Sequence, residues 1–289
     1  MPDHSSSPNQ PCHPSLDLAQ PHSAPIIGYH RAPLSQKFGT PRQPNLIALS
    51  SVIEMVAPYD TPLAFVGLEA FSHIWVSWQF HHNYLAKECQ ANRADSNFRA
   101  QVRPPRLGGN QKVGVFASRS MYRPSGLGLS VVKLEGIEVI EGRVLLTLSG
   151  ADMVDGTPII DIKPYISYSD ALANVNDGFA PAAPASLTVT INEHAQRQFE
   201  HIIAAQASIN TKDKKKQTVP ASVLVHKVQK QLLASDIDYI KALIAQDPRP
   251  AYQRQVVNKA FTMRYKSVDV SFEQSELGEL QITAMLEVE

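Results

Sequence analysis

The chain has 289 residues, of which 43% are apolar and 19% are charged, and its 27 Lys and Arg side chains balance 27 Asp and Glu side chains. This composition is sufficient for a buried core and excludes a fully disordered or highly charged chain, and no run of about 18 apolar residues exists that would span a membrane as a helix. The length predicts roughly two domains, and the zero net charge means that a basic surface for nucleic acid would have to be local.

Residues 1–24 are rich in Pro, Ser, His and Gln and hold few bulky apolar side chains, so we expect a flexible tail. They show neither the basic start nor the apolar run of a signal peptide. Cys12 and Cys89 are the only cysteines, and they form no C-x-x-C pair. A disulfide framework or a cysteine zinc site is therefore not expected, and the pattern fits a reducing cytoplasm.

Residues 25–173 are predicted to consist mainly of strands. Residues 71–80 alternate with period two, and the side chains on one face of that strand are apolar: Ile74, Val76, Trp78 and Phe80. Residues 131–140 and 143–148 form a predicted hairpin that turns at Glu141-Gly142.

Residues 157–165 predict a further strand, with Ile160 and Ile162 on one face and Asp161 and Lys163 on the other. Many short strands without regularly alternating helices favour an antiparallel sheet or barrel over a doubly wound sheet.

Residues 174–187 are rich in Pro and Ala and predict a linker, after which the pattern changes. Residues 188–289 predict a smaller α+β domain. Its helices are indicated by apolar side chains at helical spacing: Ile191, Ala195, Phe199 and Ile202; Leu224, Val228 and Leu232; and Ile240, Leu243 and Ile244 after an N-terminal Ser235. Residues 261–272 and 280–288 read as a closing hairpin. The predicted fold is mainly β: an antiparallel β-barrel followed by a smaller α+β domain.

Residues 96–134 hold seven Lys and Arg side chains, five of the chain's 14 glycines and no Asp or Glu. In a neutral chain such segregation creates a local positive field that attracts phosphates, and clustered glycines let backbone amides approach a ligand closely. The segment therefore favours an anionic ligand or nucleic acid. The alternative is a basic face that pairs with acids elsewhere in the fold.

Several common site motifs are absent from the sequence. No G-x-G-x-x-G follows a strand, no Lys-Ser/Thr follows Gly114 as a phosphate loop requires, and neither H-E-x-x-H nor G-x-S-x-G occurs. His81 and His82 would point to opposite faces of a strand, which argues against a shared metal. A Rossmann cofactor site, a zinc protease and an α/β-hydrolase are therefore not expected.

Six motifs occur in order along both halves of the chain. They are residues 41–44 (PRQP), 67–75 (GLEAFSHIW), 102–110 (VRPPRLGGN), 114–120 (GVFASRS), 154–158 (VDGTP) with 161–165 (DIKPY), and 247–252 (DPRPAY). Together they resemble the TsaA-like (TrmO) family of tRNA methyltransferases, and the resemblance covers about residues 25–289.

This resemblance implies a β-barrel methyltransferase that uses S-adenosylmethionine, with a smaller C-terminal domain and a homodimeric assembly. The implied substrate is tRNA with N6-threonylcarbamoyladenosine immediately 3′ of the anticodon, which becomes methylated on N6. The motifs imply these cofactor contacts: Pro41, Arg42, Gln43, His81, His82, Arg119, Leu129, Met153, Val154, Asp155 and Gly156. Residues 123–128 read R-P-S-G-L-G where the family commonly has R-P-N-P-I-G, and this departure makes the loop looser.

The chemistry of these residues agrees with a methyl-donor site. Arg119 suits the methionine carboxylate through a bidentate fork, and Asp155 suits the ribose or the amino group. Without the surrounding motifs, Asp155-Gly156 would read as a plain turn. The acceptor nitrogen is a poor nucleophile while protonated, so a base or an oriented water is expected. The candidates are Asp161, Tyr165 and His81.

The tRNA contacts are expected from five side chains: Arg103, Arg106, Arg123, Arg249 and Tyr252. Arg103 and Arg106 flank a stiff Pro-Pro pair and suit backbone phosphates. Prolines on both sides of Arg249 stiffen its loop, so we expect Arg249 to meet the threonyl carboxylate or a phosphate and Tyr252 to stack on an unpaired base. The alternative is that the prolines stop a helix and Arg249 pairs with a local acid.

Two other function classes compete with the methyltransferase. A non-catalytic RNA-binding barrel would use the same basic segment, but the intact PRQ and Asp155-Gly156 motifs argue against it. A hydrolase of a phosphorylated small molecule lacks its metal and nucleophile motifs. The expected partner is tRNA, and neither a metal nor a membrane is expected.

Overall fold

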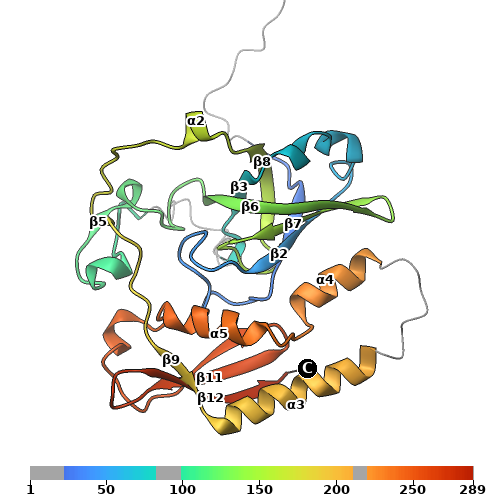
Figure 1. The fold of residues 1–289 in the computed structure, drawn as a ribbon. Helices are drawn as coiled ribbons and strands as arrows, with labels where there is room; N and C mark the ends of the chain where they lie inside the picture. Colours follow the sequence, from blue (N-terminus) through green and yellow to red (C-terminus); the bar gives the residue numbers. More distant parts are fainter. Residues whose placement is uncertain (1–22, 83–98, 211–219, 289) are drawn as a thin grey trace, which may run out of the picture.

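The computed structural model describes residues 23–82, 99–210 and 220–288 (Figure 1). The expected tail lies almost wholly outside the described residues. Within the described ranges, no helix combines the length and the apolar character that crossing a membrane requires.

Six antiparallel strands close into a barrel in the order β1-β2-β7-β6-β3-β8. They are β1 (Gly28–Arg31), β2 (Ser50–Met55), β3 (His73–Gln79), β6 (Leu127–Ile140), β7 (Arg143–Ser149) and β8 (Pro158–Pro164). Closure pairs both edges of this sheet, and the predicted antiparallel barrel is confirmed.

The barrel interior is filled by the strand faces that the sequence pattern predicts. Ile74 and Val76 of β3 are fully buried and Trp78 nearly so. The predicted hairpin joins β6 to β7, and its turn residues Glu141 and Gly142 both have positive φ, 53° and 78°. Such a pair is typical of the tight turns that match strand twist.

Residues 160–163 alternate as predicted, with Ile160 and Ile162 half-buried and Asp161 and Lys163 exposed, but a register shift brings Ile159 and not Ile160 into the core. Asp161 lies opposite Ser77 of β3, whereas Ile159 lies opposite Trp78, so the register shifts by one residue. Ile160 is the extra residue of this β-bulge. As a result Ile159 is fully buried in the barrel core, and Ile162 packs against it from the same side.

Several short elements lie in the segments between the barrel strands, in the basic segment and after β8. They are η1 (Pro62–Phe65), η2 (Leu68–Ala70), β4 (Gln101–Val102), η3 (Pro105–Leu107), β5 (Val113–Gly114), η4 (Val115–Ala117) and α2 (Ser167–Asp170). β4 and β5 pair as a small antiparallel sheet at the left of Figure 1.

The C-terminal half is a four-stranded sheet covered by helices. Its strands follow the order β10-β11-β12-β9, with β9 (Val189–Ile191) parallel to β12 (Leu280–Glu287). The expected single strand over residues 261–272 is in fact the hairpin of β10 (Phe261–Tyr265) and β11 (Val268–Gln274), because Lys266 takes a positive φ of 51° between them. The expected hairpin of β11 and β12 is present.

Three helices complete this α+β half: α3 (Glu193–Asn210), α4 (Ala221–Gln229) and α5 (Asp236–Ala245), followed by the short η6 (Ala251–Gln253). Their predicted apolar faces are largely confirmed, with Ala195, Phe199, Ile240, Leu243 and Ile244 buried in one core. Ile191 is different: it ends β9 instead of starting a helix. Ser235 precedes α5 but makes no side-chain cap hydrogen bond.

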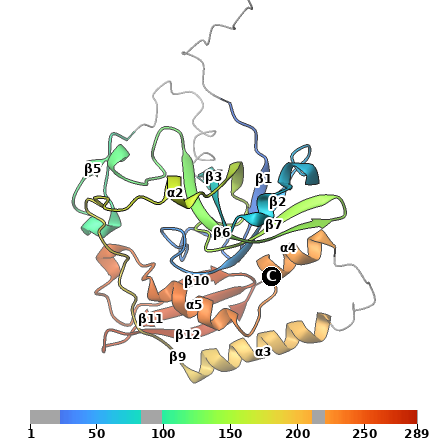
Figure 2. The same ribbon diagram turned by 45° about the horizontal axis from the view of Figure 1, so that its top comes forward.

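A segment of the barrel half packs into the C-terminal core. Leu34, Ile47 and Leu49 belong to that core, and the ring of Phe38 stacks on Phe261 and Phe272 of β10 and β11. At Gly39, which has φ +91°, a Cβ would lie 2.2 Å from Met263 Sδ. The C-terminal half therefore holds the loop that carries Pro41, Arg42 and Gln43, and the two halves meet along this segment (Figure 2).

Helix α4 packs against the outside of the barrel, although it follows the linker in sequence. Ala221 forms a buried cluster with Val52 of β2 and Leu145 of β7. Leu224 and Val228 pack against the same cluster. Both ribbon views place α4 between the barrel and the rest of the C-terminal half.

Candidate active site

The loop between β7 and β8 is fixed to the segment that follows β1. Asp155 N donates to Leu34 O at 2.7 Å, and Gly156 N donates to His30 O at 2.8 Å. The Asp155 carboxylate accepts a hydrogen bond from Ala32 N at 3.0 Å. Gly156 has φ +75°, the conformation that glycine tolerates. Asp155-Gly156 is thus a turn, and its carboxylate has a defined position.

Arg119 and Gln43 meet although 76 residues separate them. Arg119 Nη1 donates to Gln43 Oε1 at 2.5 Å. Asp152 also lies near Arg119: burial raises the pKa of this carboxyl group, and the hydrogen bond from Ser130 and the charge of Arg119 oppose the shift. Ser130 Oγ donates to Asp152 Oδ1 at 2.6 Å. The site therefore holds an exposed cation beside a largely desolvated acid.

His81 lies at the same end of the barrel, where β3 ends. Burial lowers the pKa of His81, and the adjacent His82, whose ring centroid lies 4.2 Å away, lowers it further. Asp155 and Lys37 are close enough to act on this pKa in opposite directions. His81 is therefore neutral at pH 7 and can accept a proton, with an acid nearby.

Leu129 lines a cavity of about 560 Å³ on the outer face of β3 and β6. Its side chain is 55% exposed, and the cavity wall also includes Ser77, Phe116 and Arg123. An apolar wall next to an arginine suits a flat, partly polar ligand. Met153, in contrast, is buried in the barrel core, so only its backbone faces the loop.

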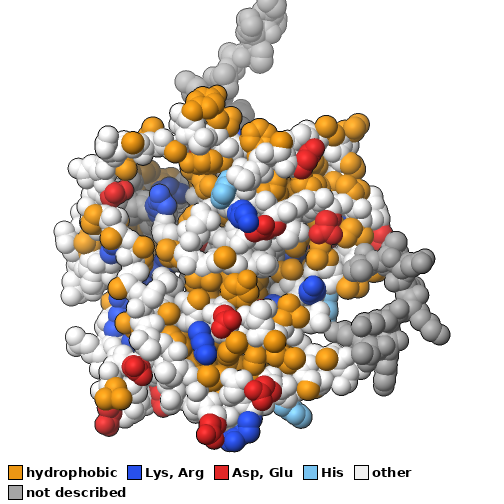
Figure 3. Space-filling view, viewed as in Figure 1, with side chains coloured by type: hydrophobic (Ala, Val, Ile, Leu, Met, Phe, Trp, Pro, Cys, Tyr) orange, Lys and Arg blue, Asp and Glu red, His pale blue; other side chains and the backbone are white. Residues whose placement is uncertain are grey.

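A groove of about 270 Å³ lies between the basic segment and the C-terminal half. Its walls are formed by Arg42, Arg103, Pro105, Gly108, Gly109, Asn110, Pro250, Ala251 and Tyr252. Tyr252 is 81% exposed. Partial burial, and then the charge of Arg254, lower the pKa of Arg42. Figure 3 shows Lys and Arg side chains gathered down the left of the face that lies over β5 and the C-terminal loops.

The prediction that Arg249 is presented to a substrate is wrong. Arg249 is 1% exposed, and its guanidinium donates to both oxygens of Asp247, at 2.7 and 3.2 Å, and to Gln274 Oε1 at 2.9 Å. Asp247 also pairs with Arg254 Nε at 3.3 Å. The structure has the alternative, local pairing, because a buried guanidinium must be neutralised where it lies. Arg249 thus supports the Pro250–Tyr252 wall of the groove from behind.

Of the remaining arginines predicted to contact tRNA, Arg103 lines the groove, and the other two donate to backbone carbonyls. Arg106 Nη2 donates to Ala182 O of the linker, and Arg123 Nη2 donates to Leu127 O. Arg123 lines the cavity beside Leu129, whereas Arg106 is not among the residues that line the groove.

The two predicted catalytic residues are separated along β8: Asp161 lies in the middle of the strand, and Tyr165 follows its last residue. Asp161 is exposed on the outer face, opposite Ser77, and its carboxylate accepts a hydrogen bond from Ile162 N. Tyr165 packs its ring near those of His73 and Trp75. His73 begins β3, six residues and so about 20 Å before Gln79 at the other end. The structure therefore does not bring Tyr165 to the His81 end.

Three side chains of this region have no signal in the sequence motifs: Asp152, His30 and Gln229. The fold buries His30 and half-buries Asp152, and Gln229 Nε2 donates to Asp155 Oδ1 from the C-terminal half at 2.8 Å. Among the described residues, no group of three or more His, Cys, Asp or Glu side chains is placed to hold a metal ion.

His30 supports the Asp155 loop as a neutral imidazole. Its Nδ1 lies 3.3 Å from Val154 O, its Nε2 is buried with no hydrogen-bond partner among the described residues, and burial lowers its pKa to about 4. The unfolded chain, in which the pKa is near 6.5, binds the proton that the folded chain excludes. The free energy of unfolding should therefore fall by up to about 3 kcal/mol as the pH drops from about 6.5 to about 4.

His30→Asn keeps a donor for Val154 O and removes this titration. Urea unfolding across that pH range should give a shallower loss of stability for the variant than for the wild type. Equal slopes for the two proteins would show that His30 does not govern the pH dependence.

The chain is similar over nearly all of its length to known proteins. The family described as tRNA-methyltransferase O N-terminal domain matches residues 29–171, and the TrmO C-terminal domain matches residues 217–287. An Escherichia coli protein named tRNA (adenine(37)-N6)-methyltransferase is 35% identical over 257 residues, covering 86% of this chain and 94% of that protein. A Pseudomonas aeruginosa protein named putative S-adenosylmethionine-dependent methyltransferase RcsF is 39% identical over 250 residues, covering 86% of this chain and 91% of that protein.

A solved structure shares the fold as well as the sequence. The crystal structure of TrmO from P. aeruginosa superposes with a TM-score of 0.63 and 30% identity, and the match covers 93% of this chain and 98% of that one. The family matches include the Gln43, Arg119 and Asp155 loops in one domain and the Pro250–Tyr252 wall of the groove in the other. The chain therefore belongs to the tRNA-methyltransferase O (TrmO) family.

Proposed function

We propose that this protein transfers a methyl group from S-adenosylmethionine to N6 of the adenine immediately 3′ of the anticodon of tRNA, with the threonylcarbamoylated base as substrate. One observation carries the proposal: two adjacent residues join the two parts of the site. Gln43 accepts a hydrogen bond from Arg119, which we assign to the cofactor, and Arg42 lines the basic groove. The names of the E. coli and P. aeruginosa relatives support the same reaction class.

The residues present fit S-adenosylmethionine. Arg119 is exposed and suits a carboxylate, and Asp155 is a fixed acceptor for hydroxyl or ammonium groups. Leu129 offers an exposed apolar contact for a flat base. We assign the cofactor to these residues together with Pro41, Arg42, Gln43, His81, His82 and the backbone of the Met153–Gly156 loop.

When bound, S-adenosylmethionine supplies an electrophilic methyl group on a sulfonium sulfur. The role of this chain is to hold the acceptor nitrogen in line with that methyl group, and such positioning supplies up to ~7–11 kcal/mol in well-oriented reactions. Methylation of N6 would release the N6 proton, so a residue of this chain would have to accept it. We assign this role to His81, because its lowered pKa leaves it neutral at pH 7 and Asp155 lies nearby. Asp161 remains an alternative base.

The groove beside Arg42 is the proposed tRNA contact. Arg42 and Arg103 face it from the barrel half, and Tyr252 faces it from the C-terminal half. Arginines suit phosphates, and an exposed tyrosine suits an unpaired base. Arg106 and Arg123 extend the same basic segment as secondary contacts.

Arg103→Ala should weaken tRNA binding and lower the magnitude of its salt slope by about one, because one phosphate contact is lost. Tyr252→Ala should weaken binding by about 1–3 kcal/mol through lost stacking, without changing the slope. Filter binding at several salt concentrations measures both effects. Arg197→Ala, on the exposed face of α3, is the matched control. Loss of S-adenosylmethionine binding in Arg103→Ala would contradict this assignment.

The outer face of β3 and β6 supports a homodimer. Phe116 is 75% exposed and Leu129 55% exposed on the same cavity wall, and exposed apolar clusters of this kind mark protein interfaces. We propose that a second copy packs on this face beside the cofactor contact at Leu129, and that the protein works in the cytoplasm, where its tRNA substrate is found. Sedimentation equilibrium at micromolar concentration tests the dimer.

Mass spectrometry of tRNA nucleosides tests the reaction. Cells that lack the protein should contain threonylcarbamoyladenosine without its N6-methyl form, and purified protein with S-adenosylmethionine should restore the methyl form. Binding of the donor and of tRNA without any methylation would support the competing function, a non-catalytic RNA-binding barrel.

A further inference from the structure

The Asp155 carboxylate is held by both halves of the molecule. Its Oδ1 atom accepts two hydrogen bonds, from Ala32 N at 3.0 Å and from Gln229 Nε2 at 2.8 Å. Within the described part of the chain, no donor lies on Oδ2. A carboxylate offers about four acceptor positions on its two oxygens. Two donors on one oxygen therefore fix the orientation of the group and leave the other oxygen for a ligand.

Gln229 owes its position to helix α4. It is the last residue of that helix, which packs on the outside of the barrel through Ala221 against Val52 and Leu145. This packing fixes the distance of the Gln229 side chain from the β7–β8 loop. A glutamine on a packed helix is a rigid support, in contrast to one on a free loop.

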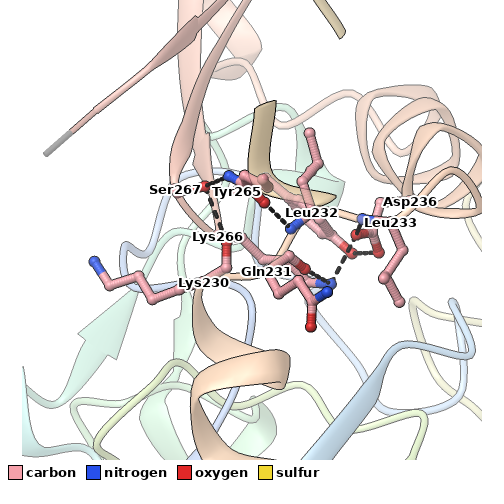
Figure 4. Close-up of polar contacts among 9 residues, drawn as sticks. Lys230, Gln231, Leu232, Leu233, Asp236, Tyr265, Lys266 and Ser267 are labelled. Atoms are coloured by element: carbon pink, nitrogen blue, oxygen red, sulfur yellow. Dashed lines mark hydrogen bonds and ion pairs between the residues drawn. The ribbon is translucent and has the colours of Figure 1, made fainter. Parts of the chain in front are cut away.

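The residues that follow Gln229 are fixed one after another (Figure 4). Lys230 O accepts from Ser267 Oγ at 2.9 Å, and Gln231 O accepts from Lys266 Nζ at 2.8 Å. The next two backbone amides donate to side chains: Leu232 N to Gln206 Oε1 at 2.8 Å and Leu233 N to Asp236 Oδ2 at 2.7 Å. Each of the residues 230–233, which begin the connector between α4 and α5, is therefore fixed by a hydrogen bond.

The same network returns to the other support of Asp155. Lys266 N donates to Pro33 O at 2.6 Å, and Pro33 lies between Ala32 and Leu34, whose backbone groups both bind Asp155. Lys266 Nζ in turn pairs with buried Asp236 at 2.7 Å. The turn between β10 and β11, at Lys266 and Ser267, therefore contacts both the segment that follows Gln229 and the segment that contains Ala32.

We propose that Gln229 is a positioning residue for Asp155, through which the C-terminal domain sets the affinity for the methyl donor. The inference rests on the proposed function, because it takes Asp155 as a donor contact. Gln229 itself touches the carboxylate and need not touch the ligand. Its loss leaves Asp155 with a single fixed donor and frees the side chain to rotate, which lowers the fraction of molecules ready to bind the donor.

Gln229→Met keeps the length of the side chain and removes its donor group. Calorimetry with S-adenosylmethionine should show roughly 10- to 100-fold weaker binding, the range for losing a hydrogen bond to a charged group. The tRNA affinity and the melting temperature should stay near wild type. Lys230→Ala is the matched control, because Lys230 contributes its backbone carbonyl and not its side chain to the network.

Gln229→Glu gives a readout that loss of packing cannot imitate. At neutral pH two carboxylates face each other and donor binding should be weak. At lower pH the pair holds a proton, which restores a donor between them, so the affinity relative to wild type should recover. In Gln229→Met the ratio to wild type should not recover.

The Asp155→Asn variant distinguishes the proposed donor site at Asp155 from the proposed positioning role of Gln229. If Asp155→Asn weakens donor binding and Gln229→Met does not, the positioning role is overturned while the proposed donor site stands. If Asp155→Asn binds the donor as well as wild type does, the donor site assigned here is overturned, and the inference with it. Equal loss of tRNA binding and donor binding in Gln229→Met would show a general structural role and would also overturn the inference.

Discussion

Asp236→Ala is expected to lower the free energy of unfolding by about 3–5 kcal/mol, because it leaves a buried lysine without its counter-charge. Asp236 is 3% exposed and Lys266 8% exposed, and the two side chains pair at 2.7 Å. The same carboxylate accepts from Tyr265 OH at 2.8 Å. Burial raises the pKa of Tyr265, so its hydroxyl stays protonated and would lose its acceptor.

Urea unfolding measures this loss, and Asp238→Ala is the control. Asp238 lies in the same first turn of α5 but is exposed, so its removal should cost little. The loss in Asp236→Ala should shrink towards alkaline pH. Burial lowers the pKa of Lys266 and Asp236 opposes this shift, so without Asp236 the folded chain binds the Lys266 proton still more weakly than the unfolded chain does. The variant therefore gains more stability than the wild type as the pH rises towards the ordinary lysine range.

A double variant tests the cause. Asp236→Leu combined with Lys266→Met buries no charge and should recover part of the stability that Asp236→Ala loses. If Asp236→Ala and Asp238→Ala lose the same amount, the network in Figure 4 contributes nothing specific to stability.

Arg119→Ala is expected to lower kcat/KM for S-adenosylmethionine by ~10- to 100-fold, which corresponds to a charge-assisted hydrogen bond of ~1.5–3 kcal/mol. Arg119 is exposed and reaches Gln43 in the neighbouring loop, so it can bind an anionic ligand group without leaving a buried partner behind. The melting temperature should therefore stay near wild type.

Arg119→Lys keeps the charge and loses the planar fork, so its loss should be intermediate. Steady-state kinetics at saturating tRNA measure both variants, with Arg197→Ala on α3 as the control. Normal donor kinetics with weakened tRNA binding would place Arg119 with the RNA and not with the cofactor.

Local sequence patterns were enough to predict several strands and turns and the chemistry of their side chains. The alternation of residues 71–80 predicted β3, and Glu141-Gly142 predicted the β6–β7 turn. Both are local signals: side-chain period and turn geometry depend on neighbouring residues alone. The ordered motifs added the family, which the matches over both domains show.

Contacts between residues far apart in the sequence could not be predicted, because they depend on how the assembled elements pack. The periodicity of the sequence does not predict the bulge at Ile160 or the turn at Lys266, because both depend on the partner strand and on packing in the core. The sequence around Arg249 is compatible with a contact to RNA or with a pair to Asp247. In the folded protein Arg249 is buried and pairs with Asp247. Gln229 meets Asp155 across 74 residues for the same reason: helix α4 packs on the barrel, and packing free energy depends on the whole assembled surface, which no stretch of sequence contains.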